Sequence, residues 1–572
     1  MTSRFSYREM CLAALLFYAG ESSAAGPGVD RVFINAKVYT LDASAPWAEA
    51  VAVNGDSIVY VGDNASALAL VGSETIRHDL NGQMLLPGFI DTHMHPIMGG
   101  AYAKALSLDT YGTPAQWVDA IAAYSTANPE SSLIFGYGFL ASAFGPLGPT
   151  RAQIDAVVSD RPVLLMDEGF HGAWANSKAL EQLKITRDTE DPIPGFSYYK
   201  RDVEGEPTGY LLEGTAELAM AGLDAITKDV IAEGTAYVLA VLSSYGVTSV
   251  FDAGVIGEQD SPALVLKEIE SAGEMTVRII GSYAVADPEQ VEGAIANAEH
   301  WRDTIKGKNY HYRMLKIMLD GTVEGRTAAM FEDYQGEPGN NGKTVLSQQQ
   351  VTHLLAQAAD KAIDVHVHAL GERAVDQALN AVESARKAHP ESATRYTICH
   401  IQVIRDQDMP RFAALDVTAQ STPLWASYDS HGKQFVSDDQ FARFWRFNSF
   451  KELGVRQTWG SDFPASGAGM LGMSPILQME IGVTRQAVGE PEAPIQPRES
   501  ERLDMATLIR GYTIDAAYQL HMEDEIGSIA VGKRADLVVL DKNLFSVGAY
   551  EIHETKVMLT LMGGEVVFEL EK

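Results

Sequence analysis

The sequence predicts an α/β protein built around a (β/α)8 barrel. Short apolar runs alternate along the chain with stretches whose length suits helices, which is the pattern of βα units and a parallel sheet. Several of these runs also end in a titratable residue. That placement is expected at the carboxyl ends of barrel strands, where the active sites of this fold lie.

The predicted elements follow one another in regular order. The apolar runs give eight strands, at residues 84–93, 246–252, 276–283, 313–319, 362–368, 395–400, 417–422 and 456–461. Helices are predicted between the later strands, at 347–361, 373–388, 405–415 and 438–453. Eight such units are the number that closes this barrel.

The first strand ends in His93 and His95, which are separated by one residue. Side chains i and i+2 of a strand share a face, so both imidazoles are aimed at one point. Imidazole is the commonest side-chain metal ligand. The alternative is a pair of polar residues bonded to backbone or water, so the pair needs further ligands to indicate a metal site.

Further candidate ligands lie at other predicted strand ends: Lys316, His368, His400 and Asp462. Together with the first two histidines they would converge on one rim of the barrel. Taken alone, His368 or His400 could be a hydrogen-bonded core histidine. The alternative for Lys316 is a salt bridge to Asp320.

The chain resembles the metal-dependent amidohydrolase superfamily, and within it amidohydrolase family 3, which includes the N-substituted formamide deformylases. The matching segments are LPGFIDTHMHP (86–96), RPV (161–163), HGAWANSKAL (171–180), EPTG (206–209), KIMLDGTVEGR (316–326), HALGERA (368–374), GSD (460–462) and IGSIAVGKRADLVV (526–539). The chain departs from the family pattern at Cys399, where glutamate is usual, and at Glu372, where aspartate is usual.

The resemblance implies how the two ends of the chain fold. Residues 26–84 and 500–572 would join into one small β-sandwich beside the metal-dependent barrel of residues 85–499. Both ends carry short alternating strands, and neither end has enough of them to bury a face alone.

The resemblance also implies that Lys316 is carboxylated. A charged lysine beside a divalent cation is repelled, so its neutral form is favoured, and a neutral amine can add carbon dioxide. The resulting carbamate has two oxygens that could bridge two metal ions. We therefore expect two ions, with zinc favoured by the histidine-rich donor set and other divalent ions as alternatives.

Residues 100–225 are predicted to form a lobe inserted after the first barrel strand, because the first two strands are separated by far more residues than a βα unit needs. A lobe above the rim would cover the metal site and shape the pocket. Its His171 resembles the inserted-lobe histidine of the family, which implies a hydrogen bond to the substrate or to the tetrahedral oxyanion; a structural role is the alternative. Tyr137, Arg326 and Trp425 are further pocket candidates by position.

Asp462 is predicted to carry the proton. Metal ions lower the pKa of bound water to about 7. Asp462 would remove a proton from this water and return it to the leaving amine, acting first as general base and then as general acid. A carboxylate that only binds metal is the alternative.

Composition and the first residues bear on partners and location. The net charge of −32 argues against nucleic acid, whose binding needs Lys and Arg at the phosphates. Residues 1–25 are typical of a secretory signal, with an apolar run shorter than the about 20 residues of a membrane span and small residues before Ala24 and Ala25. We expect a periplasmic or secreted protein without membrane contact after cleavage; an uncleaved anchor is the alternative.

The sequence thus predicts an exported metal-dependent hydrolase that cleaves a carbon–nitrogen bond of a small amide, either an N-substituted formamide or an N-acyl compound. Two alternatives stay open. The same site could serve an esterase, lactonase or carbamate hydrolase, because pocket detail rather than fold decides the substrate. A non-catalytic regulatory protein on a retained barrel is the other, and the full set of candidate ligands argues against it.

Overall fold

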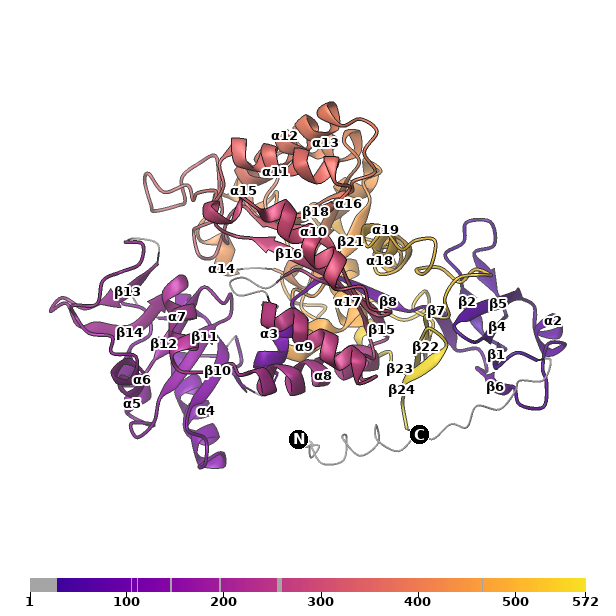
Figure 1. Ribbon diagram of the computed structural model, residues 1–572, viewed down its shortest axis with the longest axis horizontal. Helices are drawn as coiled ribbons and strands as arrows, with labels where there is room; N and C mark the ends of the chain where they lie inside the picture. Colours follow the sequence, from indigo (N-terminus) through magenta and orange to yellow (C-terminus); the bar gives the residue numbers. More distant parts are fainter. Residues whose placement is uncertain are drawn as a thin grey trace.

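A computed structural model describes residues 28–103, 105–110, 112–144, 147–194, 197–254, 260–428, 430–465 and 467–571. The predicted signal, residues 1–25, lies outside the described residues. Figure 1 shows a central barrel, with the inserted lobe at one end of the longest axis and a small sheet of the first strands at the other. No helix in the described part of the chain is long and apolar enough to cross a membrane.

The barrel is an eight-stranded sheet in which every hydrogen-bonded pair is parallel. Its strands, in chain order, are β8 (Phe89–Met94), β15 (Val247–Asp252), β16 (Arg278–Val285), β17 (Tyr310–Met318), β18 (Asp364–Ala369), β19 (Tyr396–His400), β20 (Val417–Ser421) and β21 (Gln457–Trp459). The predicted fold class is confirmed. The hydroxyl of Thr92 donates to the carbonyl of Trp459 at 2.7 Å and thereby joins the first strand to the last.

Helices cover the outside of the barrel between its strands: α8 (Lys228–Ser244), α9 (Asp260–Ser271), α10 (Ala294–Thr304), α11 (Gln348–Asp360), α12 (Glu372–Ala388), α13 (Met409–Ala414) and α16 (Phe447–Glu452). Two predicted helices are shorter than expected. Helix α13 starts only at Met409, because Pro410 fits the first turn of a helix and not its interior. The stretch 438–453 divides into α15 (Asp438–Phe441) and α16, and Trp445 between them has a φ of 52°.

The predicted first strand, 84–93, is in fact two strands in different sheets. Strand β7 (Met84–Pro87) pairs antiparallel with β22 (Leu537–Leu540), whereas the barrel strand β8 begins at Phe89. Gly88 marks the change, and a Cβ placed on it would lie 2.3 Å from Cγ2 of Thr248. The tight approach to β15 explains why a glycine stands at this junction.

The two ends of the chain form the predicted composite sandwich. One sheet has the order β5 (Ser57–Gly62), β4 (Ala50–Asn54), β1 (Arg31–Ile34) and β6 (Ile76–Asp79); the other has the order β24 (Glu565–Glu569), β23 (Val557–Met562), β22, β7, β2 (Lys37–Tyr39) and β3 (Trp47–Ala48). Their shared core contains Phe33 and Val51 from the first end and Leu537 and Leu561 from the second.

Helices α18 (Met505–Gly511) and α19 (Ile514–Gln519) fall within the predicted sandwich segment 500–572, yet they pack on the barrel. The side-chain amide of Gln519 donates to the carbonyl of Thr92 at 2.9 Å, and its oxygen accepts from the hydroxyl of Thr458 at 2.5 Å. Both partners lie on barrel strands. The barrel therefore extends beyond residue 499, and the sandwich strands resume at β22.

A buried ion pair ties the sandwich to the barrel. Arg278 begins β16, and its Nη1 lies 2.6 Å from Oδ2 of Asp536, immediately before β22. The two side chains are 1% and 2% exposed. This contact holds the amino-terminal ends of the barrel strands, which leaves their carboxyl ends free for a site.

Replacing Arg278 by Met should lower the free energy of unfolding by about 3–5 kcal/mol, because Asp536 would stay buried without its cation. Urea unfolding followed by circular dichroism measures the loss. Arg302→Met is the matched control: its ion pair with Glu299 is about one-third exposed at 3.6 Å, and the change should stay within about 1 kcal/mol. Equal losses in the two variants would contradict the prediction.

The inserted lobe is a six-stranded sheet with helices on it. Its order is β13 (Tyr198–Arg201), β14 (Pro207–Leu212), β12 (Gly172–Ala175), β11 (Val163–Asp167), β10 (Ile134–Phe139) and β9 (Leu106–Ser107). The main helices are α4 (Pro114–Ala127), α5 (Arg151–Asp155), α6 (Ser177–Gln182) and α7 (Gly214–Gly222). Helix α3 (Pro96–Tyr102) leads into the lobe directly from His95 and packs against α8 through Gly100 and Gly234.

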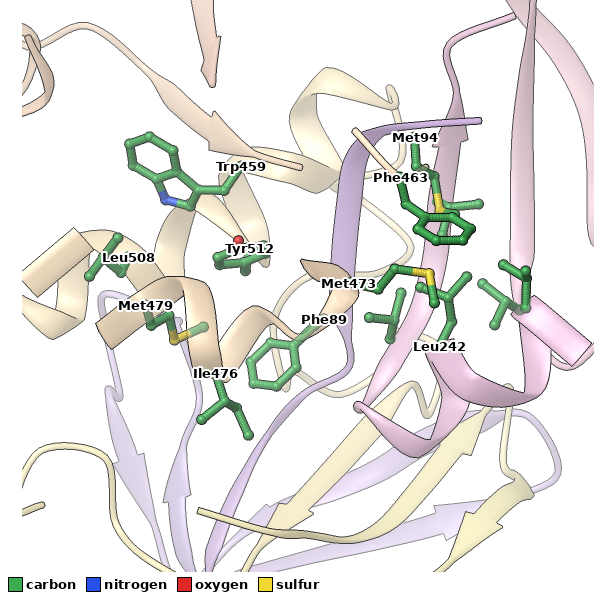
Figure 2. Close-up of a cluster of buried hydrophobic side chains, with 14 of the residues drawn as sticks. Phe89, Met94, Leu242, Trp459, Phe463, Met473, Ile476, Met479, Leu508 and Tyr512 are labelled. Atoms are coloured by element: carbon green, nitrogen blue, oxygen red, sulfur yellow. The ribbon is translucent and has the colours of Figure 1, made fainter. Parts of the chain in front are cut away.

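A hydrophobic cluster supports the first strand and the segment that follows the last one (Figure 2). Met94 and Phe463 lie close together there, beside Met473. The cluster continues through Phe89 to Tyr512, and all of these side chains are buried. Close packing of this kind leaves little freedom to the backbone on either side of it, which fixes the strand ends that carry His93 and Asp462.

Candidate metal centre

The predicted ligands all lie at or near the carboxyl ends of barrel strands. His93 is on β8 and His95 follows it, Lys316 is on β17, His368 is on β18, His400 ends β19, and Asp462 follows β21. All are buried except His95, whose side chain is 12% exposed. The barrel thus gathers residues that are hundreds of positions apart in the sequence.

Asp462 lies at the centre of the three histidines from the strand ends. Its Oδ1 is 3.4 Å from Nε2 of His93 and 3.4 Å from Nε2 of His95. Its Oδ2 is 3.9 Å from Nδ1 of His400. The Asp462 backbone has a φ of 51°, and its N–H donates to the carbonyl of His93 at 2.7 Å.

The remaining two candidates adjoin this group. Nζ of Lys316 lies 3.1 Å from Nε2 of His93. The ring centroids of His368 and His400 are 4.5 Å apart, and those of His93 and His400 are 4.6 Å apart. The structure therefore brings all six side chains into one continuous cluster, and their roles as ligands stay a prediction.

Strand register explains which side chains face the interior. In the parallel pairs, Lys316 is level with His366, and His368 is level with Cys399. Neighbours at one level of a parallel sheet point to the same face. Cys399 therefore faces the site by alternation, whereas His400, the next residue, reaches it because its backbone takes a φ of 74°.

Cys399 is the site residue that the sequence pattern marked only as a departure from the family. It is fully buried, and its Sγ lies 3.7 Å from Nζ of Lys316. Consecutive side chains of a regular strand point to opposite faces. Spacing alone therefore does not place Cys399 on the face that carries His400. The other departure, Glu372, pairs with Nη1 of Arg443 at 2.5 Å.

The donor set suits a metal cation. Burial is the largest influence on His93, His366, His368 and His400, and it holds the pKa of each well below the ordinary value, so these imidazoles are neutral. Among the described residues, Nε2 of His368 and Nδ1 of His400 have no hydrogen-bond partner. A buried acceptor without a partner is costly, and a cation would use both lone pairs.

The two histidines of the first strand are held by second contacts. Nδ1 of His93 lies 2.9 Å from Nε2 of His366, and Nδ1 of His95 lies 2.8 Å from the carbonyl oxygen of Gly254. Both contacts leave Nε2 directed at Asp462. Such contacts orient metal-binding imidazoles and fix their tautomers, so His366 supports the site through its contact with His93.

Two buried carboxylates fix the loops around the site. Asp91 accepts the N–H groups of His93 and Ser461 at 3.1 Å, and burial raises its pKa to about 7. Asp320 accepts the N–H groups of Ala329, Leu370 and Gly371. Within the described residues no ion pair joins Asp320 to Lys316, and this disfavours the salt-bridge alternative for that lysine.

His171 is held by acidic residues of the lobe. Its Nδ1 lies 2.9 Å from Oε2 of Glu213, and its N–H donates to Oδ1 of Asp167 at 2.9 Å. Burial lowers its pKa, but the hydrogen bond and charge of Glu213, with Asp167 and Glu217, outweigh this and raise the pKa to about 9. The positive charge of His171 in turn lowers the pKa of His368, so the imidazolium lies within electrostatic reach of the cluster.

Glu213→Gln should lower the pKa of His171 by about 1–3 pH units, because the neutral amide removes the charge that favours the imidazolium. The proton stays on His171 up to about pH 9 in the parent protein and should be lost nearer neutrality in the variant. NMR of ring-labelled histidine against pH measures this. Glu217→Gln, which removes a charge but no hydrogen bond to His171, is the control; an equal shift there would contradict the specific role of Glu213.

A cavity of about 330 Å³ lies between the lobe and the segment after Asp462. Tyr137 and Glu168 of the lobe line one side, and Pro464 and Leu471 line the other. None of the six predicted ligands lines this cavity, although Pro464 is only two residues from Asp462 in the sequence. The part of the lobe in shaping a substrate pocket stays a prediction.

Of the two other pocket candidates, Trp425 contacts the cluster, whereas the contacts of Arg326 are with Glu337 and Phe435. The ring of Trp425 lies 5.6 Å from that of His400, so this tryptophan borders the cluster. Arg326 pairs with Glu337 and lies over the ring of Phe435.

Comparison with known proteins agrees with the fold. A sequence model described as the amidohydrolase family matches residues 78–568. The exoenzymes regulatory protein AepA of Pectobacterium carotovorum subsp. carotovorum is 31% identical over 402 residues, which cover 69% of this chain and 85% of that protein. The N-substituted formamide deformylase of Arthrobacter pascens is 26% identical over 564 residues, 94% of this chain and 98% of the other.

A crystal structure titled as an uncharacterized metal-dependent hydrolase from Pyrococcus furiosus superposes with a TM-score of 0.70 at 23% identity, over 90% of this chain and 100% of that one. This likeness shows a common fold. The family match extends over the barrel, the lobe and most of the carboxyl-terminal end, and it confirms the resemblance predicted from the motifs. The chain belongs to the amidohydrolase family, and it is a hydrolase that acts on carbon–nitrogen bonds.

Proposed function

We propose that this chain is an exported hydrolase of N-substituted formamides or related N-acyl compounds, with two zinc ions at the barrel rim. The observation that supports it most is the cluster of six predicted donor side chains at the barrel rim, in a chain similar over 94% of its length to a formamide deformylase. Export rests on residues 1–25, which are typical of a secretory signal.

The residues that would hold the metal ions are His93, His95, Lys316, His368, His400 and Asp462. Imidazole nitrogens with a carboxylate suit zinc. A carbamate on Lys316 would add an anionic donor with two oxygens. When bound, the ions supply Lewis-acid chemistry: they polarise a carbonyl and make water a nucleophile near neutral pH.

Asp462 would move the proton. Its carboxylate faces His93 and His95 from 3.4 Å and is 10% exposed, so it is shielded from bulk water yet reachable from the rim. In this role it takes a proton from the attacking water and delivers it to the leaving nitrogen. Amide cleavage needs that delivery, because an unprotonated amine leaves poorly.

His171 would bind the substrate from the lobe side. Its side chain is 39% exposed and carries a proton held by Glu213, so it can donate a charge-assisted hydrogen bond to a carbonyl oxygen that gains negative charge. The cavity lined by Tyr137, Pro464 and Leu471 would receive the nitrogen substituent.

Metal analysis of the purified protein, followed by parallel assays, tests the proposal. The substrates are an N-formyl amine, an N-acetyl amine, the matching aryl ester and a lactone. We expect about two zinc ions per chain and the highest kcat/KM on an amide. Preference for the ester or lactone would overturn the amide proposal in favour of those substrates. A zinc-loaded protein inactive on all four would instead support a regulatory function.

Export is tested separately. Expression of the full chain in a bacterial host, followed by mass spectrometry of the periplasmic fraction, should give a chain that starts after Ala24 or Ala25. Full-length chain retained in the cytoplasm or the membrane would overturn the export proposal and leave the enzymatic one intact.

A further inference from the structure

We propose that the Cys399 thiol is an additional metal donor, so that this centre binds its cation through sulfur as well as nitrogen and oxygen. The inference rests on the proposed function, because it concerns the same metal site. It goes beyond that function because the six predicted ligands do not include a thiol.

The geometry places three donors around one point. One ring nitrogen of His93, one of His400 and the Sγ of Cys399 all lie within 4.8 Å of one another. All three residues are buried, with exposures of 1%, 2% and 0%. The second set of donors with this spacing among the described residues is His93, His95 and Asp462. His93 thus belongs to both groups, and the Cys399 thiol adds a donor to the same cluster.

A second observation points to a cation beside His400, the residue that follows Cys399. Nδ1 of His400 is buried and has no hydrogen-bond partner within the described part of the chain. Oδ2 of Asp462 lies 3.9 Å from this nitrogen, which is beyond hydrogen-bond distance. A metal ion shared with Cys399 and His93 would use that lone pair.

Charge favours an anionic donor here. Two divalent cations would bring four positive charges into this buried site, and the proposed carbamate on Lys316 and the Asp462 carboxylate would offset two of them. A thiolate supplies another negative charge in the same low-dielectric space, where an uncompensated charge is costly. On binding, the S–H bond breaks, the sulfur donates its electron pair to the cation, and the proton passes to buffer, as in other thiol–metal sites. No oxidant or reductant is needed.

Spectroscopy on the intact mature chain, residues 26–572, tests the proposal. Cys399 is the only cysteine in that chain, because Cys11 lies in the predicted signal. Chelator-treated protein reloaded with cobalt(II) should show a near-ultraviolet sulfur-to-cobalt charge-transfer band. Cys399→Ser should lose the band completely, and Thr418→Ser on the neighbouring strand β20 should keep it.

X-ray absorption of the zinc-loaded parent gives a second measurement that needs no variant. It should show a zinc–sulfur distance of about 2.3 Å. A cobalt-loaded or zinc-loaded parent that hydrolyses amides without either sulfur signal would overturn the Cys399 proposal alone. An unchanged band in folded Cys399→Ser would also overturn it. A parent that binds no metal would overturn both this inference and the proposed zinc centre.

Discussion

Asp462→Asn should lower kcat by about 10²–10⁴-fold while metal content stays near that of the parent. The range is the usual contribution of a positioned general acid–base group. In the parent protein, Oδ1 of Asp462 lies 3.4 Å from Nε2 of both His93 and His95, and the amide oxygen of the asparagine can take the same place. Unlike a carboxylate, the amide does not take up a proton at neutral pH. Steady-state kinetics on the best amide substrate, with elemental analysis of the same sample, measure both quantities.

Asp303→Asn is the control for this substitution. Asp303 is 67% exposed and pairs with Lys306 on the surface, so its loss should leave kcat and metal content unchanged. Near-normal turnover in Asp462→Asn would exclude proton transfer by this residue. Loss of metal together with activity would show instead that its carboxylate serves mainly as a ligand.

Lys316→Ala should lower metal affinity by at least about 10–100-fold. Losses of this size are typical when a residue that only orients a metal ligand is removed. Nζ lies 3.1 Å from Nε2 of His93, so truncation would remove both a carboxylated donor and the contact with that histidine. A short carboxylic acid such as acetate should restore part of the metal content and activity, because its two oxygens can replace those of the carbamate.

Lys387→Ala provides the comparison. This lysine is 74% exposed and pairs with Glu383, and its removal should change neither metal content nor the response to acetate. Retention of two metal ions and full activity in Lys316→Ala would refute the carbamate. Loss of metal without any rescue by the acid would show that Lys316 acts only by holding His93 in place.

The location of the site could be predicted because it follows from local patterns. Two rules were enough to predict it: side chains alternate along a strand with a period of two, and barrel sites lie at the carboxyl ends of the strands. They apply to the His-x-His pair and to the single titratable residues at the other strand ends. Lys316, His368 and Asp462 were found in this way. The structure placed each of them in the cluster.

Local patterns were less reliable where the backbone departs from its regular geometry. Pro87-Gly88 interrupts a run whose residues are otherwise apolar, and the approach of Thr248 shows why a glycine stands at that position. The helical pattern of 438–453 is likewise interrupted at Trp445, which takes a left-handed conformation. Neither event changes the periodicity of the sequence, so periodicity could not reveal it.

Pairings between distant segments were beyond the sequence altogether. The sequence around His171 does not indicate that Glu213 holds its proton, because β13 and β14 separate the two residues along the chain. Nothing near Arg278 indicates Asp536. Such contacts depend on how the sheets are placed against one another.

By itself, the sequence determined the barrel, the order of its strands and the rim that carries the donors, because these depend on side-chain periodicity and on residue types at strand ends. Tertiary structure alone decided which side chains enter the site together. Cys399 and His400 are neighbours that a regular strand would point to opposite faces, and the left-handed backbone at His400 brings both inward. The physical reason is that alternation is a property of one strand, whereas the departure from it is imposed by the packing of the strands around it.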